Sequence, residues 1–296
     1  MQPQTGQCIF GIEEWKLRVA LLMEEKHMDT PLETKAAYKL IKRFCSEANA
    51  ELDERWKSWK IDHSQIELHE VVGALMARQV TLAICLTESP TLWNWDIAPL
   101  FLRPMTEVYL NLAWIFEKPL ERSRAFIDYG LGQMKLRIEH LKSLPPQSDA
   151  SMQKFIEESL KSMERWVNSQ RYSCYVEVNL SKWAENQRKM ADDVGEIDFY
   201  NHCYTPYSAG VHSMWHHVGS YNLRQCTNPL HKFHKVPQVP RLGADAHFLF
   251  LAGKYLNMVF DLFDEKIGTK CQSPSAFKNV CKGIRDASSA DSTKDN

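Results

Sequence analysis

Apolar residues recur at helical spacing along nearly the whole chain. Alternating runs of β-branched residues, which are typical of strands, are almost absent, and only residues 171–180 have a composition that suits an extended segment. The sequence therefore predicts an all-α fold. The helices are expected at about 12–27, 31–60, 64–86, 97–118, 119–144, 152–170, 181–194 and 244–267.

Loop-forming residues separate these helices at two places, residues 145–151 and the proline-bearing segment 227–243. The chain ends in small polar residues, ASSADSTKDN, which we expect to be disordered. We therefore expect a single helical bundle with additions at both ends. Its parts are an N-terminal helical hairpin or arm over 1–62, a core bundle over 63–268, and a short helix with a disordered tail over 269–296.

The composition narrows the class of protein. The formal net charge of -1 argues against a strongly cationic, non-specific nucleic-acid binder. Eight cysteines without a C-x-x-C spacing suit reduced thiols in a cytoplasmic protein. No basic segment followed by an apolar run opens the sequence, and no apolar run reaches about 18 residues, so we expect neither a secretory signal nor a membrane span.

Two charged residues, Arg103 and Glu107, lie four apart on an otherwise almost entirely apolar helix, 97–118. Charged groups are costly in such a setting unless they are paired and hydrogen-bonded. Two interpretations follow. The residues form a buried ion pair that fixes the register of the helix, or they line a cleft in which the arginine binds an anion and the glutamate acts as a base or ligand.

A polar row follows later in the chain, in and just before YSAGVHSMWHHVGSYN, residues 207–222. If this segment is helical, Tyr204, Ser208, His212 and His216 are each four residues apart and share one face. The row is then either a polar stripe on a surface helix or one wall of a site.

Histidine is concentrated in the same part of the chain, since seven of the 11 histidines lie within residues 202–247. His212 and His216 have the spacing of helical zinc ligands, but the glutamate of an H-E-x-x-H motif is missing. We therefore expect no metal, and keep a divalent ion held by His212, His216 and Glu107 as the less favoured alternative. The potential ligands in this segment are His202, Cys203, His212, His216, His217, Cys226, His231, His234 and His247.

Three separated stretches, RPMTEVYLNLAWIF, SRAFIDYG and KWAENQRKMADDVGEIDFYNHCYTPYSAGVHSM, resemble a widespread, mainly bacterial, all-helical family of unknown function. The family pattern is an Arg-x3-Glu pair, an aromatic-rich middle helix and a late Tyr-x3-Ser-x3-His helix. Phe126 and Tyr129 match its middle part, and the resemblance covers roughly residues 65–225.

The resemblance implies an all-α fold and a shared pocket made from Arg103, Glu107, Ser208 and His212. It implies no established activity. Relatives of this general kind occur among mobile-element and phage-defence genes, which makes a role directed at nucleic acid an expectation.

Three functions suit these residues. The first is a metal-independent ribonuclease or phosphodiester-directed toxin, with His212 as general acid or base, Arg103 on the phosphate, Glu107 orienting or sharing protons, and Tyr204 and Ser208 binding substrate. The second is a non-catalytic helical sensor or adaptor, and the third is the metal-dependent hydrolase. The expected partners are RNA or a protein, including a second copy of the chain. An open cleft beside Arg103 and His212 would favour an enzyme, and a sealed, mutually bonded cluster would favour a structural role.

Overall fold

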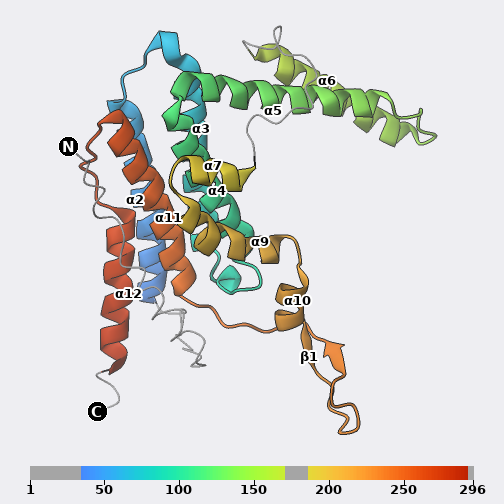
Figure 1. Cartoon of the computed structure of the whole chain (residues 1–296), viewed down its shortest axis with the longest axis vertical. Coiled ribbons are helices and arrows are strands. Elements are labelled where there is room, and N and C mark those ends of the chain that lie inside the picture. The colour runs from blue at the N-terminus through green and yellow to red at the C-terminus, as the bar shows by residue number, and fades with distance from the viewer. Residues whose placement is uncertain (1–34, 171–185, 293–296) are drawn as a thin grey trace.

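The computed structural model of the chain describes residues 35–170 and 186–292, and its architecture is helical (Figure 1). This confirms the expected all-α fold. The expected helix at 12–27 and the segment 171–180 lie outside the described residues. The long helices are α2 (Lys35–Ser58), α3 (Ile66–Thr87), α4 (Pro99–Glu117), α5 (Pro119–Lys142), α6 (Ala150–Ser169), α11 (His247–Ile267) and α12 (Ala276–Ser292).

The ends of these helices follow from local sequence. Asp62 precedes the short helix η1 (His63–Gln65), and its Oδ1 accepts a hydrogen bond from the Ser64 amide at 2.9 Å. Asp149 caps α6 in the same way, at 2.8 Å from the Ser151 amide. Prolines occupy the first position of α4 and of α5, where no amide hydrogen is needed.

The hydrophobic core lies where α3, α4 and α11 meet. α3 packs against α2, α4, α5 and α11, and α11 also covers α4 and α12. Trp93, which follows the short helix η2 (Pro90–Leu92), is fully buried, and its indole Nε1 donates a hydrogen bond to the Leu86 carbonyl at 2.7 Å. The other largest fully buried side chains include Phe44, Phe248, Tyr255, Phe260 and Phe263.

One helix among the described residues, His63–Thr87, is long and apolar enough to cross a membrane by length and composition. A central helix of a bundle meets the same criterion, because it is buried on several sides. In this structure 56% of its most apolar window is buried against other helices.

The first helix that the structure describes, α2, packs into the bundle. Ile41, Phe44 and Ala48 of α2 belong to the same hydrophobic core as α3 and α11. The C-terminal helix α12 packs against α2 and α11 and continues through Ser292, so it extends into the segment expected to be a disordered tail. Only residues 293–296 of that tail lie outside the described residues.

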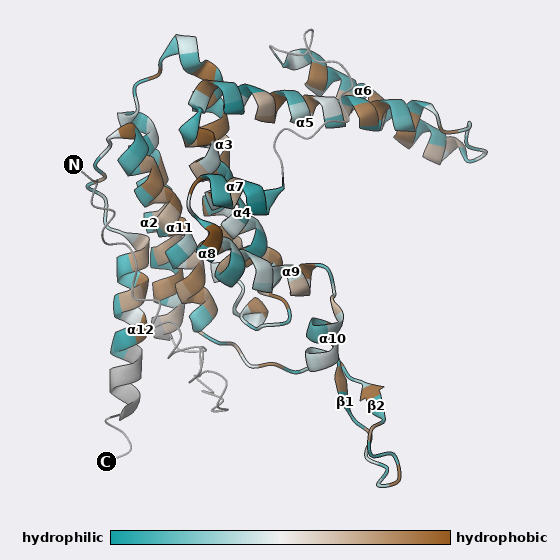
Figure 2. Cartoon of the chain, in the orientation of Figure 1, coloured by the Kyte–Doolittle hydropathy of each residue, from teal (hydrophilic) through white to brown (hydrophobic). Residues whose placement is uncertain are grey.

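Two elements project from the bundle (Figures 1 and 2). The first, the α5–α6 arm, consists of the outer part of α5 together with α6, which packs mainly on α5. The second is an antiparallel hairpin of β1 (Leu223–Gln225) and β2 (Lys235–Pro237), with Arg224 opposite Val236. The sequence analysis expected only a loop over 227–243, because three-residue strands carry little alternation.

Candidate functional site: an arginine-centred cluster between α4 and α9

The second half of the candidate site lies on short helices that pack across α4. A π-helical turn, η3 (Tyr200–Tyr204), follows α7 (Gln187–Asp193) and α8 (Ile197–Phe199) and leads into α9 (Thr205–Val211). α9 lies close to the start of α4 at Gly210, where a Cβ atom would lie 3.0 Å from Pro99 Cβ. Only glycine fits this approach without displacement of the neighbours.

Arg103 is the centre of the cluster. Its Nε donates to Ser208 Oγ at 2.8 Å, its Nη1 donates to Glu107 Oε2 at 2.9 Å, and its Nη2 donates to the Tyr204 hydroxyl. The guanidinium also lies over the Tyr204 ring, 3.2 Å from the ring centroid. Each nitrogen of the guanidinium therefore has a partner within the same chain.

The cluster is buried on the Arg103 side and open to solvent on the Glu107 side. The Arg103 side chain is 13% exposed, whereas that of Glu107 is 41% exposed. Gln187 Nε2 donates to Glu107 Oε1 at 3.2 Å and to Asn111 Oδ1 at 2.9 Å. Glu107 thus bonds to α7, and Arg103 bonds to α9, so the two side chains join α4, α7 and α9 into one hydrogen-bonded network.

Tyr204 is a hydrogen-bonding group and not a base at neutral pH. Burial is the largest influence on its hydroxyl and raises its pKa to about 12, although the Arg103 charge acts in the opposite direction. The Tyr204 ring stacks on Tyr200, with 4.7 Å between the ring centroids. The phenol therefore keeps its proton beside Arg103.

The predicted row of four residues on one helical face is interrupted at His212. α9 ends at Val211, and Ser213 has a left-handed φ of 49°. The amide of Ser213 donates to the Gly210 carbonyl and that of Met214 to the Ala209 carbonyl, which is the Schellman pattern of a helix end. His212 and His216 are consequently on different elements, and both are exposed.

The histidine buried in this region is His217, on α10 (Trp215–Tyr221), which the sequence analysis named only as a potential metal ligand. Its Nε2 lies 3.1 Å from Asp96 Oδ1, in the segment before α4. Tyr109 and Glu196 form a second contact that the sequence did not indicate, at 2.8 Å, and burial raises the pKa of the Glu196 carboxyl. Both pairs join segments far apart in sequence, so local spacing carried no signal for either.

The alternative metal ligands do not come together as one group. Among the described residues, the only histidine, cysteine and carboxylate side chains that gather in a set of three or more around one possible ion position are Cys226, His231 and His234. Glu107, His212 and His216 are not in that set.

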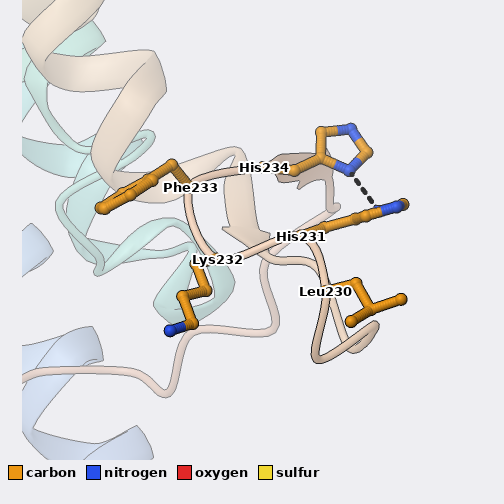
Figure 3. A pocket seen from close by; sticks show the side chains of 5 residues that line it. All are labelled: Leu230, His231, Lys232, Phe233 and His234. Carbon is orange, nitrogen blue, oxygen red and sulfur yellow. Dashed lines mark hydrogen bonds between the residues drawn. The ribbon is translucent and has the colours of Figure 1, made fainter.

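Two hollows on the described surface lie away from the cluster. One, of about 560 Å³, is lined by residues near the C-terminal ends of α2 and α11, including Trp59 and Thr269. Another lies at the tip of the β-hairpin (Figure 3). Arg103 lines neither of them.

By its fold and by this cluster, the protein is an all-α bundle with an arginine-centred polar network between two of its helices. The chain belongs to a family of unknown function, DUF5677, which matches residues 69–228. This confirms the resemblance expected from the sequence, and the match carries no activity. Searches of curated proteins and of solved structures found no match.

Proposed function

We propose that this protein is a non-catalytic helical binding module in which the Arg103 cluster braces α4 against α9. The observation that carries the proposal is the set of bonds from Arg103 to Glu107, Tyr204 and Ser208. An arginine that binds a phosphate presents two parallel N–H groups outward. Here the Arg103 side chain is 13% exposed, and each nitrogen of its guanidinium already donates to the same chain.

The position of His212 supports the same conclusion. A general acid or base must lie within hydrogen-bond reach of the reacting atoms, together with the group that stabilises their charge. His212 follows the end of α9 and is exposed, whereas Arg103 is enclosed between α4 and α9. This difference in exposure supports a bracing role for Arg103 over a role in a metal-independent ribonuclease.

The α5–α6 arm is the surface that we propose for binding. On α6, Met152, Phe155 and Trp166 are 49%, 65% and 48% exposed, while Val167 is buried. Phe155 and Trp166 are eleven residues apart, which is three helical turns, so they lie on one face. Exposed aromatic side chains on one face are typical of protein interfaces.

A second copy of the chain is the partner that we propose for this arm. α6 carries three basic and three acidic residues, so it has no net charge to repel another copy. Two helical hairpins that meet through their apolar faces form a four-helix bundle, a common dimer architecture.

Self-association should depend on the aromatic residues of the arm. Replacing Phe155 and Trp166 together by serine should weaken the dimer about 10-fold or more, because aromatic anchors contribute most of the binding energy of such interfaces. Sedimentation velocity over a range of concentrations measures this. Trp215→Ser is the matched control, since Trp215 is 75% exposed but lies on α10. A wild type that stays monomeric at its highest soluble concentration contradicts the dimer.

The wild-type protein should not cleave RNA. A labelled pool of cellular RNA, incubated with wild type and with folded His212→Ala in the presence and absence of EDTA, tests this. If the wild type cleaves RNA in the presence of EDTA and His212→Ala does not, the protein is a metal-independent ribonuclease and the proposal of a non-catalytic binding module is wrong. Cleavage that EDTA abolishes would favour a metal-dependent hydrolase instead.

A further inference from the structure

Three metal-ligating side chains meet in the loop of the β-hairpin. Cys226 directly follows β1, His234 directly precedes β2, and His231 lies in the loop between them. The two imidazole rings approach each other through their Nδ1 atoms (Figure 3). The ligand atoms of all three residues lie within 4.8 Å of one another.

Two of the three distances between ligand atoms match those around one tetrahedral ion, and the third lies within 4.8 Å. Zinc binds cysteine sulfur at about 2.3 Å and histidine nitrogen at about 2.0–2.1 Å, which places a sulfur and a nitrogen ligand about 3.6 Å apart and two nitrogens about 3.4 Å apart. Cys226 Sγ lies 3.7 Å from His231 Nδ1, and the Nδ1 atoms of His231 and His234 are 3.4 Å apart. We propose that Cys226, His231 and His234 form a zinc site, independently of the function proposed above.

Hydrogen bonds within the loop position the three ligands. The Cys226 amide donates to the His234 carbonyl at 2.9 Å, and the His231 amide donates to the Asn228 carbonyl at 3.0 Å. Gln225 Nε2 lies within hydrogen-bonding distance of the carbonyls of His231, Lys232 and His234. Ligands that are held by such hydrogen bonds lose less conformational entropy when they bind an ion.

The ligand set selects the metal. A thiolate with two imidazoles suits zinc, whereas magnesium and calcium prefer oxygen ligands. Coordination through Nδ1 requires a proton on Nε2 of the same ring. His231 Nε2 lies 3.3 Å from Asn228 Nδ2, and Asn228 Oδ1 accepts a hydrogen bond from the Leu230 amide at 3.0 Å. A protonated Nε2 would therefore donate to solvent and not to Asn228.

Three protein ligands leave one tetrahedral position for water or another group. The loop is exposed, and Leu230 and Phe233 beside the ligands are 88% and 96% exposed. An ion bound here would close the loop between the two strands and fix the direction in which these two apolar side chains point.

Zinc titration of the tag-free, full-length chain tests the site, with a chromophoric chelator as competitor. We expect one equivalent of zinc to bind and Cys226→Ser or His234→Ala to weaken binding on the order of 100-fold or more. Cobalt in place of zinc should give a thiolate-to-metal absorption band that Cys226→Ser removes. Circular dichroism verifies that the variants are folded.

The controls are Cys85→Ser and His216→Ala, which change an exposed cysteine on α3 and an exposed histidine on α10. Both should bind zinc as the wild type does. The proposal is overturned if the wild type binds no zinc, if Cys226→Ser retains full affinity, or if the two controls lose affinity as strongly as the loop variants do.

Discussion

Replacing Arg55 by alanine should lower the free energy of unfolding by about 3–5 kcal/mol, since it leaves buried acidic groups without their partner. Arg55 is 4% exposed and joins α2 to α11. Its Nη2 and Nε donate to the two carboxylate oxygens of Asp264 at 2.8 and 3.0 Å, and its Nη1 donates to Glu51 at 3.2 Å. The guanidinium also lies 4.3 Å from the centroid of the Phe260 ring.

The loss should be larger at neutral pH than in acid. Burial is the largest influence on Glu51 and raises its pKa, although Arg55 favours the charged form. A carboxyl whose pKa is raised by folding favours the folded state below its unfolded pKa, and this contribution is lost as the pH rises through the folded pKa. Without Arg55 the folded pKa of Glu51 should rise further, so the variant should lose more stability as the pH increases.

Urea denaturation at several pH values measures both effects. Arg43→Ala is the matched control, because Arg43 pairs with Glu47 on the same helix but its side chain is 54% exposed, and it should cost less than about 1 kcal/mol. A loss for Arg55→Ala as small as that of the control would contradict the role of Arg55 as the ionic link between α2 and α11.

Replacing Arg103 by alanine should cost about 2–3 kcal/mol, less than the Arg55 change, because Glu107 is 41% exposed and water can take over part of its solvation. The change leaves Tyr204 and Ser208 without their charged donor. Arg103→Lys should recover only part of the loss, since an ammonium cannot reach three partners in the geometry of a guanidinium.

A double-mutant cycle with Ser208→Ala isolates the bond across the two helices. Residues that are in contact show coupling energies of about 0.5–3 kcal/mol, and the Arg103–Ser208 pair should fall in that range. Chemical denaturation of the wild type, the two single variants and the double variant supplies the values. Additive losses would show that Arg103 does not brace α4 against α9, and would remove the main support for the non-catalytic proposal.

The spacing of apolar and polar residues along the sequence predicted the features that depend on local sequence, namely the long helices and the side-chain pairs on one helical face. Apolar periodicity indicated the long helices, because all of them except α6 pack against the core, and α6 packs on α5. The i,i+4 spacing of Arg103 with Glu107, and of Tyr204 with Ser208, placed each pair on one helical face. A charged pair on an apolar helix needs a polar partner, and the structure supplies it from α9 and the turn before it.

The end of α9 could not be predicted from spacing. A helix usually ends in this way at glycine, which adopts a positive φ without strain, but here Ser213 occupies that position. Contacts between residues far apart in the chain could not be predicted from the sequence either. His217 meets Asp96 across 121 residues, and no local pattern reports such a pairing.

The ends of the family match do not coincide with the limits of the packed helical bundle. The match begins at residue 69, inside α3, and ends at residue 228, between Cys226 and His231. α2, α11 and α12 lie outside it, although α11 covers both α3 and α4. A polypeptide trimmed to the region of shared ancestry would therefore leave much of the central pair of helices facing water and would separate one proposed zinc ligand from the other two. The segment that the family model matches is therefore smaller than the helical bundle in which it packs.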